Sequence, residues 1–285
     1  MAAATSTEIH RHKVKVLRSE EDLALALAKY TADLAHKFIK EKGVFTVVLS
    51  GGYLISSLRK LVQPPFSGTI DWSKWYVFWV DERVVPKYHK ESNYKVAYDG
   101  FLSKVPIHPN NVYAINDALT AERAAEDYEA RISHLVSTNI VPLSKITGFP
   151  KFDLMLLGMG PDGHVAALFP GHPIMHERRR WVTFIRNAPK PPPHRITFTF
   201  PVINSAAHIA MVVTGLGEIN AVKAVLGGGG SHGPDNILPA QMVSPEEEIT
   251  WFLDKEAAST CLGVEQNNDQ YAECPKDCPC CCIVM

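Results

Sequence analysis

Apolar residues in this chain gather in short runs that are separated by longer amphipathic stretches. The runs are rich in β-branched and aromatic residues, which is typical of buried strands. We predict strands over 44–49, 75–80, 112–116, 152–159, 181–185, 195–200, 208–215 and 249–254. The stretches between them repeat apolar residues at helical spacing, and they predict helices over 19–43, 53–63, 120–136 and 218–226. Ser19 and Asp22 have capping-box spacing at the first helix start, and Gly43 is suited to end that helix.

Apolar strands that alternate with helices predict an α/β domain, in which helices cover both faces of a mainly parallel sheet. No boundary rich in Pro, Gly or Ser divides the body, so we place a single domain at 13–260. We expect residues 1–12 and the glycine-rich loop 227–236 to be flexible. The polar tail 261–285 lacks the apolar content to fold alone, and we expect it to be disordered.

The composition narrows the possible function classes. A net charge of −1 over 285 residues gives no general basic field for nucleic acid, and we expect no nucleic-acid partner. Of the six cysteines, Cys261 stands alone and the other five lie within 274–282, so the body has no disulfide framework. No apolar segment reaches the roughly 20 residues that span a bilayer. Residues 1–16 show no secretory signal and leave little room for a transit peptide, so we expect a cytoplasmic protein.

Three glycines after the strand 152–159 raise the question of a dinucleotide site. Gly158, Gly160 and Gly163 fit the pattern G-x-G-x-x-G. A dinucleotide site needs a long helix after the third glycine, but Pro170 arrives seven residues later. It also needs an acidic residue about 20 positions onward, where this chain has arginine and asparagine at 186 and 187. Dinucleotide binding is therefore disfavoured.

The same loop offers a different chemistry through Asp162 and His164. Ligands bind outside the carboxyl ends of strands in open α/β sheets, and His164 would be presented there. A histidine with an ordinary pKa near 6.5 is mostly neutral at pH 7 and suits a general base, which Asp162 could orient. The alternative is a solvated or structurally bonded histidine, one of twelve in the chain.

Two other loops follow strands at equivalent positions. Ser50, Gly51 and Gly52 come between a strand and a predicted helix, where free N–H groups suit a phosphate, although a plain tight turn is the alternative. Arg83 in the segment 81–83 could bind phosphate oxygens, and a surface ion-pair cluster is its alternative. Taken together, the three loops predict a pocket for a small, phosphorylated, hydroxyl-rich ligand.

Six segments carry a family resemblance: "LSGG", "WVDERVVP", "SNY", "FDLMLLGMGPDGHVAALFP", "PHRITFTFPVIN" and "WFLDKEAAS". In this order and spacing they resemble the 6-phosphogluconolactonases over residues 13–260, and their residues are similar to those of the plant members. The resemblance implies a Rossmann-like domain shared with glucosamine-6-phosphate deaminases and ribose-5-phosphate isomerases, and it implies no metal or organic cofactor. It also implies hydrolysis of a phosphosugar lactone to 6-phosphogluconate in the oxidative pentose phosphate pathway.

The resemblance also assigns roles to residues of this chain. His164 would activate water against the lactone carbonyl and return the proton to the ring oxygen. Asp162 and Gly163 would shape the ring end of the pocket. The residues implied at the phosphate and in the pocket lining are Ser50, Gly51, Gly52, Arg83 and Arg195. No serine sits in a G-x-S-x-G elbow, so we expect no covalent intermediate.

Three departures from the family pattern bear on this function. Tyr53 replaces a common serine after the two glycines, Ala167 replaces a frequent serine, and Glu218 stands where a lysine is common. A carboxylate at 218 would oppose a phosphate dianion if it lies beside one. Two alternatives therefore stay open: a sugar-phosphate isomerase or deaminase on the same fold, and a catalytically weak sugar-phosphate sensor.

The last four residues, "CIVM", fit the C-a-a-X pattern for a prenyl group on Cys282. One prenyl chain anchors weakly, and Cys280 and Cys281 could supply a second signal by palmitoylation. The alternatives are an unmodified tail and soft-metal binding by the cysteines. The tail thus predicts partial, peripheral membrane association.

Overall fold

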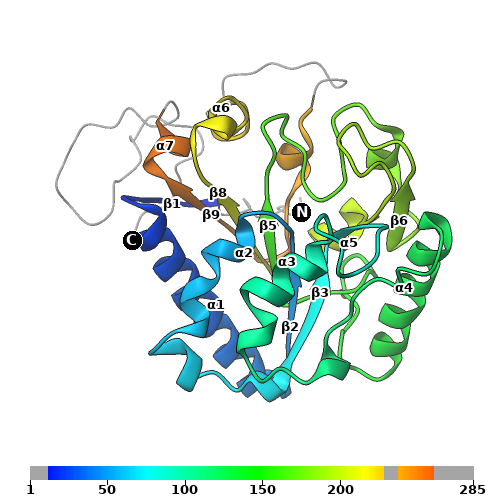
Figure 1. The fold of residues 1–285 in the computed structure, drawn as a ribbon, viewed down its shortest axis with the longest axis horizontal. Coiled ribbons are helices and arrows are strands. Elements are labelled where there is room, and N and C mark those ends of the chain that lie inside the picture. The colour runs from blue at the N-terminus through cyan, green and yellow to red at the C-terminus, as the bar shows by residue number, and fades with distance from the viewer. Residues whose placement is uncertain (1–11, 228–236, 260–285) are drawn as a thin grey trace, which may run out of the picture.

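A parallel sheet of six strands forms the centre of the molecule, in the order β1-β9-β8-β5-β2-β3 (Figure 1). The computed structural model describes residues 12–227 and 237–259. All neighbouring strands of this sheet run parallel, which confirms the predicted fold class. The strands are β1 (His12–Leu17), β2 (Phe45–Leu49), β3 (Trp75–Trp79), β5 (Leu154–Gly158), β8 (His208–Val213) and β9 (Glu248–Asp254).

Helices cover both faces of the sheet, because successive strand residues point to opposite sides. On β2, Val47 and Leu49 pack into one apolar cluster, and Val48 packs into the other. The first cluster includes residues of α1 (Glu20–Lys42), α2 (Leu54–Ser57) and α3 (Asn93–Gly100). The second includes residues of α4 (Ala121–Ser137), α5 (Phe200–Asn204), α6 (Ile219–Leu226) and α7 (Lys255–Ala258).

The longest helix, α1, has the ends that the sequence predicts. Ser19 Oγ accepts the backbone N–H of Asp22 at 3.1 Å. Gly43 adopts φ +82°, and its N–H donates to the carbonyl of Ile39. Glycine adopts this left-handed conformation at no steric cost, so the helix stops there.

A second, antiparallel sheet lies beside the parallel one. Its strands are β4 (Asp81–Arg83), β7 (Arg195–Phe198) and β6 (Val182–Ile185), in the order β4-β7-β6. The strands predicted at 181–185 and 195–200 therefore belong to this small sheet, and the second one ends where α5 begins. β4 pairs with β7 so that Arg83 lies opposite Arg195. The pairing brings two predicted site segments together.

Two predicted elements differ from the structure. The helix over 53–63 is divided into the short α2 and a 3-10 helix at Arg59–Val62. The hydroxyl groups of Ser56 and Ser57 both donate to the Tyr53 carbonyl, and such bonds compete with a regular helix. The strand over 112–116 is reduced to a single bridge between Val112 and Val77.

Several predictions concern residues outside the described ranges. They are the flexible N-terminus 1–12 apart from His12, the flexible loop 227–236 apart from Gly227, and the disordered tail 261–285 with Cys282. In the part of the chain that is described, no helix is long and apolar enough to cross a membrane.

Candidate active site

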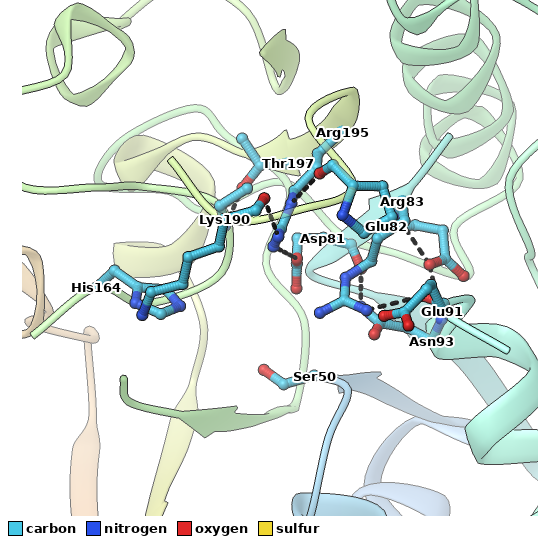
Figure 2. A network of polar contacts seen from close by, with 12 residues as sticks. Ser50, Asp81, Glu82, Arg83, Glu91, Asn93, His164, Lys190, Arg195 and Thr197 are labelled. Carbon is cyan, nitrogen blue, oxygen red and sulfur yellow. Dashed lines mark hydrogen bonds and ion pairs between the residues drawn. The ribbon is translucent and has the colours of Figure 1, made fainter. Parts of the chain in front are cut away.

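A cavity of about 250 Å³ opens at the carboxyl ends of the central strands. Its walls come from the segments that follow β2, β5 and β8 and from the small antiparallel sheet. This is where open α/β sheets bind ligands. Figure 2 shows four of the predicted residues around this space. The predicted residues that line the cavity are Ser50, Gly51, Gly52, Arg83, His164 and Arg195.

The loop after β5 presents His164 to the cavity and pairs it with Asp162. The Nδ1 atom of His164 lies 2.5 Å from Oδ1 of Asp162. Burial lowers the pKa of His164 below its ordinary value, although the hydrogen bond with Asp162 raises it. The imidazole is therefore neutral at pH 7.

Asp162 fixes which nitrogen of the His164 ring carries the proton. Burial would raise the pKa of Asp162, but the interactions with His164 and Lys190 outweigh it and hold that pKa below its ordinary value. The Nζ atom of Lys190 lies 3.2 Å from Oδ1 of Asp162. An ionised carboxylate only accepts hydrogen bonds, so Nδ1 of His164 donates and the lone pair lies on Nε2. A neutral imidazole in this tautomer can act as a general base.

The surroundings of the His164 ring leave little freedom. A Cβ atom on Gly160 would lie 2.1 Å from Cε1 of His164, so this position requires glycine. The ring of Phe169 packs on the imidazole with 4.7 Å between centroids. These contacts hold the ring in one orientation toward the cavity.

The loop Ser50–Gly52 contacts the first residue of α3. A Cβ atom on Gly51 would lie 1.9 Å from Oδ1 of Asn93. Asn93 itself donates from Nδ2 to the Asp81 carbonyl at 2.9 Å. Gly52 has φ +67°, which favours glycine. The loop therefore approaches α3 closely, and backbone groups rather than side chains form this wall of the cavity.

Asp81 and Glu82 are buried and Arg83 is half-buried, so the alternative of a surface ion-pair cluster is wrong. Glu82 is 2% exposed, and its carboxylate accepts the N–H groups of Arg83, Asn93 and Tyr94 at 2.7, 2.8 and 2.8 Å. Burial raises the pKa of Glu82 to about 7, although these N–H groups lower it. Glu82 thus attaches the start of α3 to β4 and holds Arg83 in place.

The two arginines of the cavity have different partners. Arg83 donates from Nη1 to the Glu91 carbonyl at 2.7 Å, and its Nε has no partner among the described residues. Because Nε is itself buried, the Nη groups are the donors that Arg83 can offer to an anion in the cavity. Arg195 donates from Nη2 to the Lys190 carbonyl at 2.9 Å, and its Nη1 lies 3.9 Å from Oδ2 of Asp81 (Figure 2). Asp81 thus offsets the charge of Arg195, whereas Arg83 is the better anion ligand.

Two of the three departures from the family pattern meet in this cavity. Tyr53 and Glu218 both line it, and Oη of Tyr53 donates to Oε1 of Glu218 at 3.3 Å. Ala167 is fully buried, and its N–H donates to Oγ1 of Thr197 at 3.3 Å. Ala167 lies behind the wall, so its replacement of a serine removes no hydroxyl from the cavity surface.

Two predicted residues do not line the cavity. Asp162 contacts His164 instead, as described above. Gly163 has φ +75°, its carbonyl accepts the N–H of Ala240, and a Cβ atom there would lie 2.9 Å from Leu238. Gly163 therefore shapes the turn that carries His164 and packs against the 238–240 segment.

Sequence reasoning assigned no role to Lys190, Asp81 or Asn93. Asn93 belongs to the "SNY" segment and Asp81 to "WVDERVVP", so the motifs marked both positions without giving their function. Lys190 stands among prolines, where no local pattern points to the histidine it approaches. In the described ranges, no group of three or more His, Cys, Asp or Glu side chains could hold a metal ion.

The chain is similar to known proteins over most of its length. The family model for glucosamine-6-phosphate isomerases/6-phosphogluconolactonase matches residues 18–251. The chain is 60% identical to 6-phosphogluconolactonase 3, chloroplastic, of Arabidopsis thaliana over 91% of this chain and 78% of that protein. It is 59% identical to the probable 6-phosphogluconolactonase 4, chloroplastic, of Oryza sativa subsp. indica over 87% and 76%. The crystal structure of 6-phosphogluconolactonase from Thermotoga maritima superimposes with a TM-score of 0.71 at 27% identity, over 86% of this chain and 100% of that one.

Proposed function

Since the chain belongs to the family of glucosamine-6-phosphate isomerases and 6-phosphogluconolactonases, we propose that it hydrolyses 6-phospho-D-glucono-1,5-lactone to 6-phospho-D-gluconate. This reaction is a step of the oxidative pentose phosphate pathway. The observation that carries the proposal is the His164–Asp162 pair beside a cavity that also contains Arg83 and the loop Ser50–Gly52. The names of relatives at 60% and 59% identity support the same reaction.

Hydrolysis begins when Nε2 of His164 removes a proton from a water molecule. The water oxygen forms a bond to the lactone carbonyl carbon, and negative charge moves to the carbonyl oxygen. When this tetrahedral intermediate collapses, the bond from the carbonyl carbon to the ring oxygen breaks. The His164 imidazolium then gives its proton to the departing oxygen. Asp162 keeps the Nδ1 proton in place throughout and stabilises the transient positive charge.

The phosphate end of the substrate lies at Arg83 and the loop Ser50–Gly52. Arg83 lines the cavity, its Nη donors match phosphate oxygens, and charge-assisted bonds of this kind are strong. Arg195 lines the wall between this end and His164, where Asp81 offsets its charge. The substrate is thereby held with its ring toward the histidine.

No covalent intermediate is needed for this substrate. A δ-lactone is an activated ester, and a positioned base contributes about 10²–10⁴-fold to the rate. Ser50 lines the cavity, and its Oγ accepts the Gly158 N–H at 3.4 Å. Among the described residues its hydroxyl forms no hydrogen bond with His164 that would activate it, and water is the nucleophile.

One NMR experiment separates this function from its alternatives. Fresh 6-phosphogluconolactone is incubated with the protein, and its loss is compared with the spontaneous rate. Faster formation of 6-phosphogluconate supports the lactonase. Glucosamine 6-phosphate and ribose 5-phosphate are tested in parallel, because ammonia or a ketose phosphate would indicate the deaminase or isomerase chemistry. Ligand binding that raises thermal stability without turnover would indicate a sensor.

We also propose that Cys282 is farnesylated and that the protein is cytoplasmic with a membrane-associated fraction. The cysteine-free body supports a reducing compartment, which the chloroplast of the two plant relatives also provides. Prenylation by the C-a-a-X pattern requires Met285 to be the last residue of the native chain. The intact mass of the native protein shows both where the chain ends and whether a lipid is attached. A fluorescent fusion to the amino end of the native coding sequence would hide a transit peptide, so antibody staining of the untagged protein decides the compartment.

A further inference from the structure

Two side chains from separate segments meet in the cavity away from the histidine pair. Tyr53 follows the loop Ser50–Gly52, and Glu218 directly precedes α6. The Tyr53 hydroxyl donates to the Glu218 carboxylate at 3.3 Å, and both residues line the cavity. Glu218 is only 7% exposed, whereas Tyr53 is 55% exposed. The tyrosine therefore holds a buried carboxylate at the end of the cavity formed by the Ser50–Gly52 loop.

The charges that line the cavity are two arginines and two carboxylates. Asp81 lies 3.9 Å from Arg195, so each offsets the other. Within the described ranges Glu218 forms no ion pair, and its tyrosine partner carries no charge. Partial burial and then the Glu218 carboxylate raise the pKa of Tyr53, so its hydroxyl keeps its proton and goes on donating. Glu218 therefore adds a negative charge to the cavity that Arg83 also lines.

This carboxylate distinguishes between two kinds of ligand terminus. A phosphate dianion would be attracted by Arg83 and repelled by Glu218, and repulsion by a buried carboxylate such as Glu218 is stronger than in bulk water. A neutral hydroxyl can donate to Glu218, and a hydrogen bond to a carboxylate is stronger than one between neutral groups. The pair thus weakens binding of the phosphorylated terminus and adds an acceptor for the unphosphorylated one.

We propose that Glu218, positioned by Tyr53, is a specificity-determining residue that adapts this cavity to aldonolactones with a free terminal hydroxyl as well as to those with a terminal phosphate. The proposal rests on the lactonase function argued above. The terminal hydroxyl of the unphosphorylated lactone donates to Glu218, while the lactone ring meets His164 in the same way as in the phosphorylated substrate. Both lactones are therefore opened by the same attack of water.

The test compares kcat/KM for 6-phosphogluconolactone and for glucono-1,5-lactone, each above its spontaneous rate. Glu218→Gln keeps the shape and removes the charge, and we expect it to raise the ratio of phosphorylated to unphosphorylated activity about tenfold or more. The change should appear as a lower KM for the phosphorylated lactone and a higher KM for the other. Tyr53→Phe removes one hydroxyl and frees the carboxylate to turn away, so we expect about a threefold change in the same direction.

Glu41→Gln is the matched control, because it removes the same charge at an exposed position near the end of α1, before β2 begins. Its activity ratio should equal that of the wild type. Thermal unfolding of each variant shows whether the buried position tolerates the change. A further test uses the wild type alone. The inhibition constants of gluconate and 6-phosphogluconate should differ by less than about 100-fold.

Two results overturn the proposal. One is a Glu218→Gln protein that folds like the wild type and keeps its activity ratio. The other is a wild type that prefers 6-phosphogluconate over gluconate by more than about 100-fold. If the wild type accelerates neither lactone, the proposed function fails instead. In that case the dissociation constants of gluconate and 6-phosphogluconate are measured by calorimetry, and a preference for 6-phosphogluconate of more than about 100-fold overturns the specificity proposal. The specificity proposal also fails if neither acid binds.

Discussion

The His164 imidazole is subject to two opposing influences. Burial disfavours its charged form, and the Asp162 carboxylate favours that form. Burial prevails, so the ring is neutral and Nε2 has a free lone pair at neutral pH. The hydrogen bond to Asp162 nevertheless decides the tautomer and makes the lone pair available to water. Burial and Asp162 together set the base strength of the ring, and Asp162 also sets its tautomer.

We predict that kcat/KM for the lactone rises with pH through a single ionisation below 6.5 and is level by about pH 7. The sign follows because only the neutral imidazole accepts a proton and because the pKa of His164 is lowered. Initial rates between about pH 5 and pH 7.5, corrected for spontaneous opening at each pH, measure this profile. An ionisation above 6.5 would mean that the charged partner, and not burial, controls the ring.

Asp162→Asn should lower kcat about 10–100-fold and shift the ionisation to lower pH. The amide introduced by this substitution can donate to Nδ1, which moves the ring proton to Nε2 and removes the base. The shift to lower pH follows because Asp162 raises the pKa of His164. Lys190→Met should shift the ionisation the opposite way, because Lys190 lowers the pKa of His164. If neither variant shifts the ionisation, neither charge acts on the ring.

At the scale of elements, short loops after strands carry the site, and glycine lets them approach other segments. Gly160 leaves room for the His164 ring, and Gly51 leaves room for Asn93. The sequence marked these loops because each combines a buried strand with glycines and a polar residue. It could not indicate their contacts with Asn93 and Lys190, because those contacts come from other parts of the chain. The elements β1 and α3 were missed for a different reason, because their apolar patterns are weaker.

Gly51→Ala should reduce kcat/KM at least about tenfold, because its Cβ would lie 1.9 Å from Oδ1 of Asn93 and would displace the Ser50–Gly52 loop. Gly68→Ala is the control, since a Cβ atom there meets nothing within 4 Å. Steady-state kinetics and urea unfolding of both variants separate a local change from lost stability. Activity of Gly51→Ala equal to that of the control would show that this loop does not form the binding surface.

For the whole molecule, the sheet order explains how distant segments form one cavity. β2, β5 and β8 are neighbours, so the loops that follow them open at the same edge (Figure 1). Alternating strands and helices were enough to predict this parallel sheet. The pairing of β4 with β7 in the antiparallel sheet was not predictable, because these two strands lie far apart in the sequence and no hairpin turn joins them. That pairing is what places Arg195 beside Arg83.

Cys282→Ser should move the membrane-bound fraction of the protein into the supernatant, because a prenyl chain needs the thiol and a single chain binds membranes reversibly. Fractionation of cells that express the native chain and this variant at equal levels measures the change. Cys261→Ser, which leaves the C-a-a-X pattern intact, is the control and should fractionate like the native chain. Identical fractionation of all three proteins would contradict lipidation at Cys282.

The most direct test of the central claim is the rate of 6-phosphogluconolactone opening by wild type and His164→Ala, followed by NMR against the spontaneous rate. We predict clear acceleration by the wild type and a loss of about 10²-fold or more in the variant, since His164 supplies the base. A wild type that does not exceed the spontaneous rate, or a folded His164→Ala variant that keeps full activity, would contradict histidine-assisted lactone hydrolysis in this cavity.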